Sequence, residues 1–170
     1  MKNHQLQLLA KSAFEHGGSI RKGKRKIARP ICTKRAMHVV LRAKRAKGRW
    51  SMLNNRCRGL VNLIALELAE KHGVKIYGFE NVGNHIHILL KTRTRRGLQN
   101  FLRIFTQKIM FLVTGARKGS PQGKFWDALA YSRIVEWGNS YLRVKKYFAK
   151  NLREALGLQR IYKKMSPLPP

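Results

Sequence analysis

The residues of this chain best suited to chemistry begin with two histidines in one short apolar stretch. His85 and His87 flank Ile86 within residues 83–90, which are otherwise typical of a β-strand. Side chains two apart on a strand share one face of the sheet. Both imidazoles are therefore expected to point the same way, while the aliphatic residues between and after them face a core. Two imidazoles on one face are half of a metal site.

Tyr147 and Asn151 are four residues apart, which places both on one face of a helix. A helix packed beside the histidine strand would complete a set of two imidazoles and one carboxamide oxygen. That set suits a divalent ion such as Mg²⁺ or Mn²⁺, with Zn²⁺ as a further alternative. The metal would act as a Lewis acid on a phosphodiester oxygen. Tyr147 would be the nucleophile, assisted by the metal, by a base or by Lys146 or Lys150, because a free tyrosine has a pKa of about 10.

Each of these residues also has a plain structural interpretation. A His-x-His pair occurs by chance. Tyr147 is equally suited to a core position with a bonded hydroxyl, and Asn151 to the surface. If Tyr147 is the nucleophile, a phosphotyrosine link conserves the bond for a later strand to attack, which suits cutting and rejoining DNA better than hydrolysis.

The charge of the chain predicts its partner. The 170 residues include 37 Lys and Arg against 7 Asp and Glu, a net charge of +30. Such a field attracts polyanions, and Lys and Arg on phosphates release counterions. Nucleic acid is therefore expected, with a membrane surface as the minor alternative, since no apolar run reaches the ~18 residues that span a bilayer. Cys32 and Cys57 form neither a disulfide framework nor a CxxC metal site, which favours a cytoplasmic, nucleoid-associated protein.

The elements that must position these residues follow in the order β-α-β-β-α-β-α. Strands are expected at 37–43, 74–82, 83–90 and 131–136, and helices at about 54–70, 96–113 and 141–156. This order predicts an α+β, ferredoxin-like split βαβ fold, with a four-stranded antiparallel sheet, helices on one face and the site on the other. Residues 36–158 would form the catalytic domain and 159–170 a tail. His38 would share the open face, although a lone histidine is more often structural.

The side chains expected to contact nucleic acid are basic, with one aromatic residue suited to base stacking. They are Arg21, Lys22, Lys24, Arg25, Lys26, Arg42, Lys44, Arg45, Lys47, Arg49, Trp50, Arg95, Arg96, Lys118, Lys146 and Lys150. The first five lie in a basic N-terminal segment, residues 1–35, which is expected to be flexible. It is either a passive tail or an arm that orders on nucleic acid. Trp50 is equally well explained as a lid over the core.

Residues 84–90, with a hydrophobic residue between the two histidines, resemble the HUH motif of single-tyrosine transposases, and residues 147–151 resemble their tyrosine helix. The pattern is most similar to the REP-associated tyrosine transposase branch, in which a Trp-containing segment, a strand and a Tyr-x-x-x-Asn helix follow in order. Here these are residues 125–126, 131–135 and 147–151. The basic residues that lead into residues 37–42, together with that stretch, also resemble the first strand of this family. The resemblance covers about residues 30–157.

The resemblance implies cleavage of single-stranded DNA beside hairpins, a 5′-phosphotyrosine intermediate and a divalent metal. By that match His85 and His87 are metal ligands, Asn151 is the third ligand and Tyr147 is the nucleophile. The chain departs from the family at Leu152 and Gly83, where the family usually has proline, and at residues 132–133, where an acidic residue or histidine is common.

The function predicted is therefore metal-dependent DNA nicking and strand transfer, in which the tyrosine helix serves its own chain or that of a homodimer partner. A non-catalytic nucleic-acid binder, such as an RNA-binding protein or a domesticated transposase, is the alternative. Two-histidine phosphoesterases need two separated His-x-Ser/Thr motifs, and the single His-x-His excludes them.

Overall fold

The structure is a computed structural model that describes residues 14–21, 25, 27–117, 119–120 and 122–155. Within them five strands form one antiparallel sheet, in the order β1-β5-β2-β4-β3. The strands are β1 (Glu15–His16), β2 (Ala36–Arg42), β3 (Val74–Asn81), β4 (His85–Thr92) and β5 (Tyr131–Val135). The helices are α2 (Arg58–Lys71), α3 (Arg95–Thr114) and α4 (Asn139–Ala155), with 3-10 turns η1 (Gly18–Arg21) and η2 (Gly48–Trp50).

The predicted α+β class and antiparallel ferredoxin-like order are confirmed, with one correction: the sheet has five strands where four were expected. The added strand β1 comes from the N-terminal segment and pairs with β5. Arg29 reinforces this edge, because its guanidinium donates to Ser132 Oγ and to the Ala130 carbonyl. The flexibility of residues 1–35 and the domain limits at 36 and 158 stay predictions.

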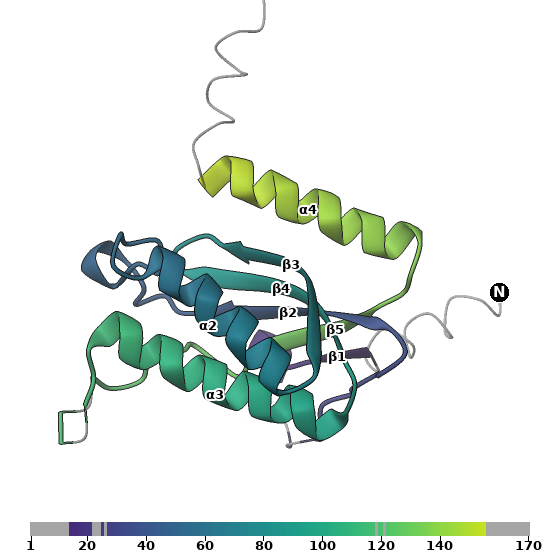
Figure 1. Ribbon diagram of the computed structural model, residues 1–170, viewed down its shortest axis with the longest axis horizontal. Helices are drawn as coiled ribbons and strands as arrows, with labels where there is room; N and C mark the ends of the chain where they lie inside the picture. The colour runs from purple at the N-terminus through teal and green to yellow at the C-terminus, as the bar shows by residue number, and fades with distance from the viewer. Residues whose placement is uncertain (1–13, 22–24, 26, 118, 121, 156–170) are drawn as a thin grey trace, which may run out of the picture.

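The two faces of the sheet carry different layers (Figure 1). Helices α2 and α3 cover one face, where the main core lies. Alternate residues of β2 and β4 point into it, and Val39, Leu41, Ile86 and Ile88 are all at most 1 % exposed. Burying each such side chain contributes about 1.5–3 kcal/mol relative to leaving it in water. The histidines occupy the alternate positions, so they face the other side.

Helix α4 covers that other face. Val144 and Phe148 pack there with Ala36, Leu89 and Val135 in a second, smaller core. The aromatic rings of Tyr77, Trp137 and Tyr141 pack together beside the start of the helix, 5.0–6.1 Å between centroids. The helix that carries the predicted nucleophile is thus attached to the sheet face that carries the histidines.

Local sequence sets most of the element ends. Thr94 caps α3 by accepting a hydrogen bond from the Gly97 amide, and Gly115 ends it in the left-handed conformation. Helix α2 begins at Arg58, later than the expected start at residue 54 or 55. The reason is a turn in which Asn54 accepts hydrogen bonds from the amides of Arg56 and Cys57.

The turn between β3 and β4 explains a departure from the family pattern. Gly83 has a φ of 91°, whereas proline is locked near −65°. Its amide also donates a hydrogen bond to Asn81 Oδ1, which proline has no N–H to make. Glycine at this position therefore belongs to a different turn, built with Asn81, that leads directly into the histidine strand.

Candidate active site

Strand register assembles the site on the face covered by α4. His87 on β4 lies opposite Val40 on β2 and Glu80 on β3, while His85 lies opposite Arg42. Residues directly opposite in an antiparallel pair share one face, with Cβ atoms about 4.5–5.5 Å apart. Both histidines are therefore flanked on this face by charged side chains.

The two imidazoles meet edge to face, with 4.8 Å between ring centroids. Nδ1 of His85 donates a hydrogen bond to Asn84 Oδ1 at 2.6 Å. Nδ1 of His87 lies 3.1 Å from Nε2 of His38, a residue of β2. The histidine pair predicted from the His-x-His spacing thus extends to three histidines.

Burial keeps these histidines neutral. His87 is 3 % exposed, and burial, followed by the positive charge of His38 and His85, lowers its pKa to about 3. Burial, with a contribution from Arg133, lowers the pKa of His38 to about 4. Burial and then Arg42 also lower the pKa of His85. Because a histidine must be deprotonated to bind a metal, all three are in the form that a ligand requires near pH 7.

One atom of the site fits a metal directly. Nε2 of His87 is buried and has no hydrogen-bond partner among the described residues. With Nδ1 of His85 donating to Asn84, the Nε2 of His85 is left with a lone pair. Nε2 of His85 is therefore available to a divalent ion, and Nε2 of His87 is available when the hydrogen of that ring is on Nδ1.

The rest of the ligand set is not made of the usual side chains. In the part of the chain that the structure describes, no group of three His, Cys, Asp or Glu side chains, the three histidines included, is arranged so that all three could hold one metal ion. A third protein ligand would have to be of another type, such as a carboxamide. Asn151 belongs to α4, but its side chain lies outside the described part of the structure, so its role stays a prediction.

Helix α4 brings Tyr147 to the histidines. The Tyr147 ring meets the His87 ring edge on, with centroids 5.5 Å apart, and 47 % of Tyr147 is exposed. The tyrosine predicted from sequence as the nucleophile is therefore next to the predicted metal ligands, and it remains accessible to a substrate.

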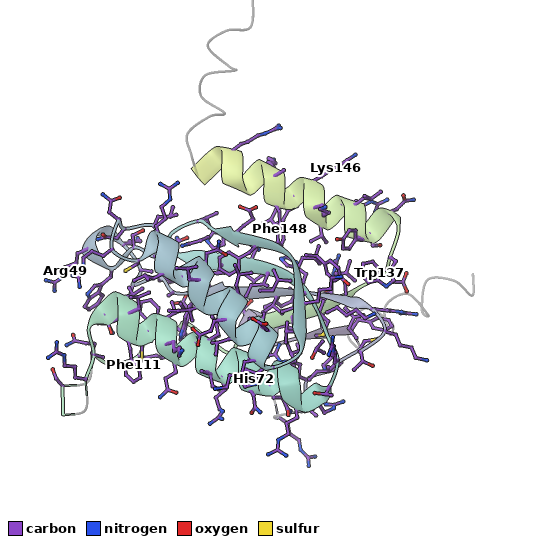
Figure 2. All side chains as sticks on the ribbon, viewed as in Figure 1. Arg49, His72, Phe111, Trp137, Lys146 and Phe148 are labelled. Atoms are coloured by element: carbon purple, nitrogen blue, oxygen red, sulfur yellow. The ribbon has the colours of Figure 1, made fainter. Side chains whose placement is uncertain are left out.

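Phe148 anchors this part of α4 on the sheet. It is 4 % exposed and points from α4 toward the sheet, while Lys146 points away (Figure 2). Its ring covers Gly78, where an added Cβ would lie 3.2 Å from Phe148 Cδ2. The ring also lies 5.3 Å from that of His38 and 5.7 Å from that of His87. A small residue on β3 thus allows the helix to approach closely.

Sequence reasoning missed two residues of this face. His38 was judged more often structural, yet it contacts His87, Tyr147 and Phe148. Glu80 was given no role, yet it lies opposite His87, and burial raises the pKa of its carboxyl. The alternation of β2 predicted the face of His38, but only the pairing of β2 with β4 places it beside His87.

The predicted nucleic-acid contacts divide between several surfaces. Around η2 the guanidinium carbons of Arg45 and Arg49 lie 4.8 and 5.6 Å from the centre of the Trp50 ring. The same ring packs against the main core, as the lid interpretation predicts, while its role in base stacking stays a prediction. Arg42, Lys44 and Lys47 are exposed in the same region.

The other predicted contacts lie elsewhere. Lys146 and Lys150 are exposed on α4, and Arg95 and Arg96 are exposed at the start of α3, on the far side of the sheet. Arg25 is exposed in the N-terminal segment. Lys22, Lys24, Lys26 and Lys118, and the side chain of Arg21, lie outside the described part of the structure. None of the described helices is both long and apolar enough to cross a membrane.

The chain is similar to known proteins in sequence and in fold. The sequence profile of the family described as "Transposase IS200 like" matches residues 32–151. Curated proteins include no match. Among solved structures, a REP-associated tyrosine transposase bound to a REP hairpin has a similar fold, with a TM-score of 0.53 and 8 % identity over 73 % of this chain and 70 % of that one. A putative transposase from Deinococcus radiodurans has a TM-score of 0.45 and 15 % identity over 75 % of this chain and 98 % of that one.

The profile covers most of the chain, from the residues before β2 to the predicted ligand Asn151 on α4. It spans both histidines of the pair and the tyrosine that the fold brings beside them. The predicted resemblance to tyrosine transposases is confirmed, and the chain belongs to the IS200-like transposase family.

Proposed function

We propose that this transposase cuts single-stranded DNA with Tyr147, beside hairpins, and transfers the cut strand through a 5′-phosphotyrosine intermediate. The observation that carries the proposal is the position of Tyr147, whose ring lies 5.5 Å from that of buried His87 on a helix anchored by Phe148. A tyrosine in ordinary core packing would bury its ring, whereas 47 % of this residue is exposed.

The reaction is a transesterification. The hydroxyl oxygen of Tyr147 attacks the scissile phosphorus, the new phosphorus–oxygen bond forms, and the bond to the 3′ oxygen breaks. The phenol loses its proton and the departing 3′ oxygen takes one up, so the strand ends in a 3′ hydroxyl. A 3′ hydroxyl of another strand later attacks the same phosphorus and releases Tyr147. No hydrolysis or external energy is needed.

His85, His87 and Asn151 would hold a divalent ion, Mg²⁺ or Mn²⁺. When bound, that ion supplies Lewis-acid polarisation of a phosphate oxygen. The protein contributes two neutral imidazoles, one oriented by Asn84. It also supplies the cations of Lys146 and Lys150, which stand on the tyrosine helix and would attract the phosphates on either side of the cut.

The substrate is inferred from charge and from the neighbouring structure. A net charge of +30 suits a phosphate backbone, and the REP-associated transposase of similar fold was solved with a REP hairpin. The sixteen residues predicted to contact nucleic acid would supply the binding surface, within a cytoplasmic, nucleoid-associated protein. The tyrosine helix would serve its own chain, because α4 brings Tyr147 beside His87 of the same chain, and exchange of the helix with a homodimer partner is the alternative.

The test is formation of a covalent protein–DNA adduct on single-stranded hairpin DNA with Mn²⁺ or Mg²⁺. Tyr147→Phe should abolish the adduct and chelation should prevent it. The matched control is Tyr131→Phe, another tyrosine of this face, for which burial and Glu15 raise the pKa to about 12. It should retain the adduct. If the wild type binds DNA without forming one, the non-catalytic binder is the correct interpretation.

A further inference from the structure

His38 lies at the centre of the site, although the proposed reaction gives it no task. Its Nε2 is 3.1 Å from Nδ1 of His87, and the two rings stack with 5.3 Å between centroids. The same ring lies 5.3 Å from Phe148 and 6.5 Å from Tyr147, measured between centroids. One side chain thus contacts a proposed ligand, the proposed nucleophile and the residue that seats α4.

The hydrogen bond between His38 and His87 can have either of two directions. A hydrogen bond between neutral imidazoles carries one proton, so one ring donates and the other accepts. If His87 donates from Nδ1, its Nε2 has a bare lone pair. If His38 donates from Nε2, the remaining hydrogen of His87 is on its own Nε2, which is buried and has no hydrogen-bond partner among the described residues.

Burial favours one of these two hydrogen-bond directions. A buried N–H without an acceptor loses its hydrogen bond to water and gains nothing in return. A buried lone pair at the same position can be satisfied by a metal ion. The neighbouring ligand follows the same rule, because Nδ1 of His85 donates to Asn84 Oδ1 and leaves Nε2 available. Histidines that bind metals usually donate their second N–H to such a partner.

We propose that His38 is a positioning residue, which accepts a hydrogen bond from Nδ1 of His87 and thereby keeps Nε2 of His87 available to a metal ion. The inference rests on the proposed metal role of His87. His38 belongs to β2, whereas the other proposed residues of the site belong to β4 and α4. Loss of a partner of this kind typically lowers metal affinity about 10- to 100-fold.

Two variants separate the hydrogen bond from packing. His38→Phe keeps an aromatic ring against Phe148 but has no acceptor, whereas His38→Gln keeps a polar atom that reaches His87. Nitrogen-15 NMR of the metal-free full-length protein reports which nitrogen of His87 carries the hydrogen. Calorimetric titration with Mn²⁺ then measures metal affinity in the wild type and in both variants.

We expect His87 of the wild type to be protonated on Nδ1. In His38→Phe this form should lose population, and the affinity for Mn²⁺ should fall about 10- to 100-fold, while His38→Gln stays close to the wild type. His87 protonated on Nε2 in the wild type would overturn the inference, as would equal Mn²⁺ affinities of wild type and His38→Phe. If His38→Phe does not fold, the wild-type tautomer alone decides.

Failure of the proposed function would be distinguishable. A wild type that binds no Mn²⁺, or forms no adduct through Tyr147, overturns the proposed reaction. The tautomer of His87 is measured without metal or DNA, so it judges the role of His38 separately.

Discussion

Substitution of Gly78 tests how far cleavage of the DNA depends on the packing of α4 against the sheet. A Cβ on Gly78 would lie 3.2 Å from Cδ2 and 3.3 Å from Cε2 of Phe148. Gly78→Val adds three carbon atoms to this contact. Phe148 is 4 % exposed and lies between the sheet and the helix, so it has little room to retreat. The turn that carries Tyr147 is therefore expected to lift away from His87.

The magnitude follows from the packing. Extra carbon atoms in a well-packed core typically cost about 1–3 kcal/mol. If that cost falls on the docking of α4, the ratio of docked to undocked helix drops by about 5- to 140-fold, since 1.4 kcal/mol is a factor of ten. Valine suits a β-strand, so the strand itself should not be the source of the loss.

The assay is single-turnover formation of the protein–DNA adduct, with hydrogen exchange of the α4 amides measured in parallel. Adduct formation should slow by up to the factor above, and exchange in α4 should rise, while affinity for DNA changes little. Gly59→Ala is the matched control, because nothing lies within 4 Å of an added Cβ there. Gly78→Val combined with Phe148→Leu should recover part of the rate by restoring space. Wild-type rate and exchange in Gly78→Val would refute the reasoning.

Three further outcomes are expected. In the unfolded chain, His38 and His87 become protonated below a pH of about 6.5, whereas in the folded protein they do so only near pH 4 and 3. The free energy of unfolding should therefore fall as pH drops from 6.5 toward 4. Urea titration should show a shallower decline for His38→Gln than for the wild type. Arg29→Met should lower the free energy of unfolding by about 1–3 kcal/mol, because Ser132 Oγ and the Ala130 carbonyl lose their donor; an unchanged urea midpoint would contradict this. Lys146→Ala should weaken binding of all single-stranded sequences alike. Because it removes one phosphate contact, it should also reduce the slope of log affinity against log salt by about 1. An unchanged slope would show that Lys146 is not part of the interface.

Local pattern was sufficient for much of the fold and for half of the site. The alternation of β4 predicted that His85 and His87 share one face with aliphatic side chains on the other. The four-residue spacing predicted Tyr147 and Asn151 on one side of a helix. Helix and strand positions followed from periodicity with shifts of a few residues at their ends, the largest at the start of α2.

The missing parts depend on which strands pair and in what register. β1 has two residues, too few for a periodic signal, and exists because β5 offers it an edge. His38 and His87 are 49 residues apart and meet through the pairing of β2 with β4. Glu80 reaches the same face through a ladder whose register shifts between Ile76 and Gly78. Contacts of this range carry no local signature.

The sequence by itself determined the chemistry available: two imidazoles on one face, a tyrosine on a helix and a strongly positive field. Those properties depend on residue type and on spacings of two and four, which strands and helices convert directly into shared faces. The tertiary structure decided that the parts meet. Gly78 lets Phe148 seat α4 on the sheet, which brings Tyr147 beside His87, and strand register adds His38. Packing between distant segments sets these distances, because it depends on the shapes of both partners at once.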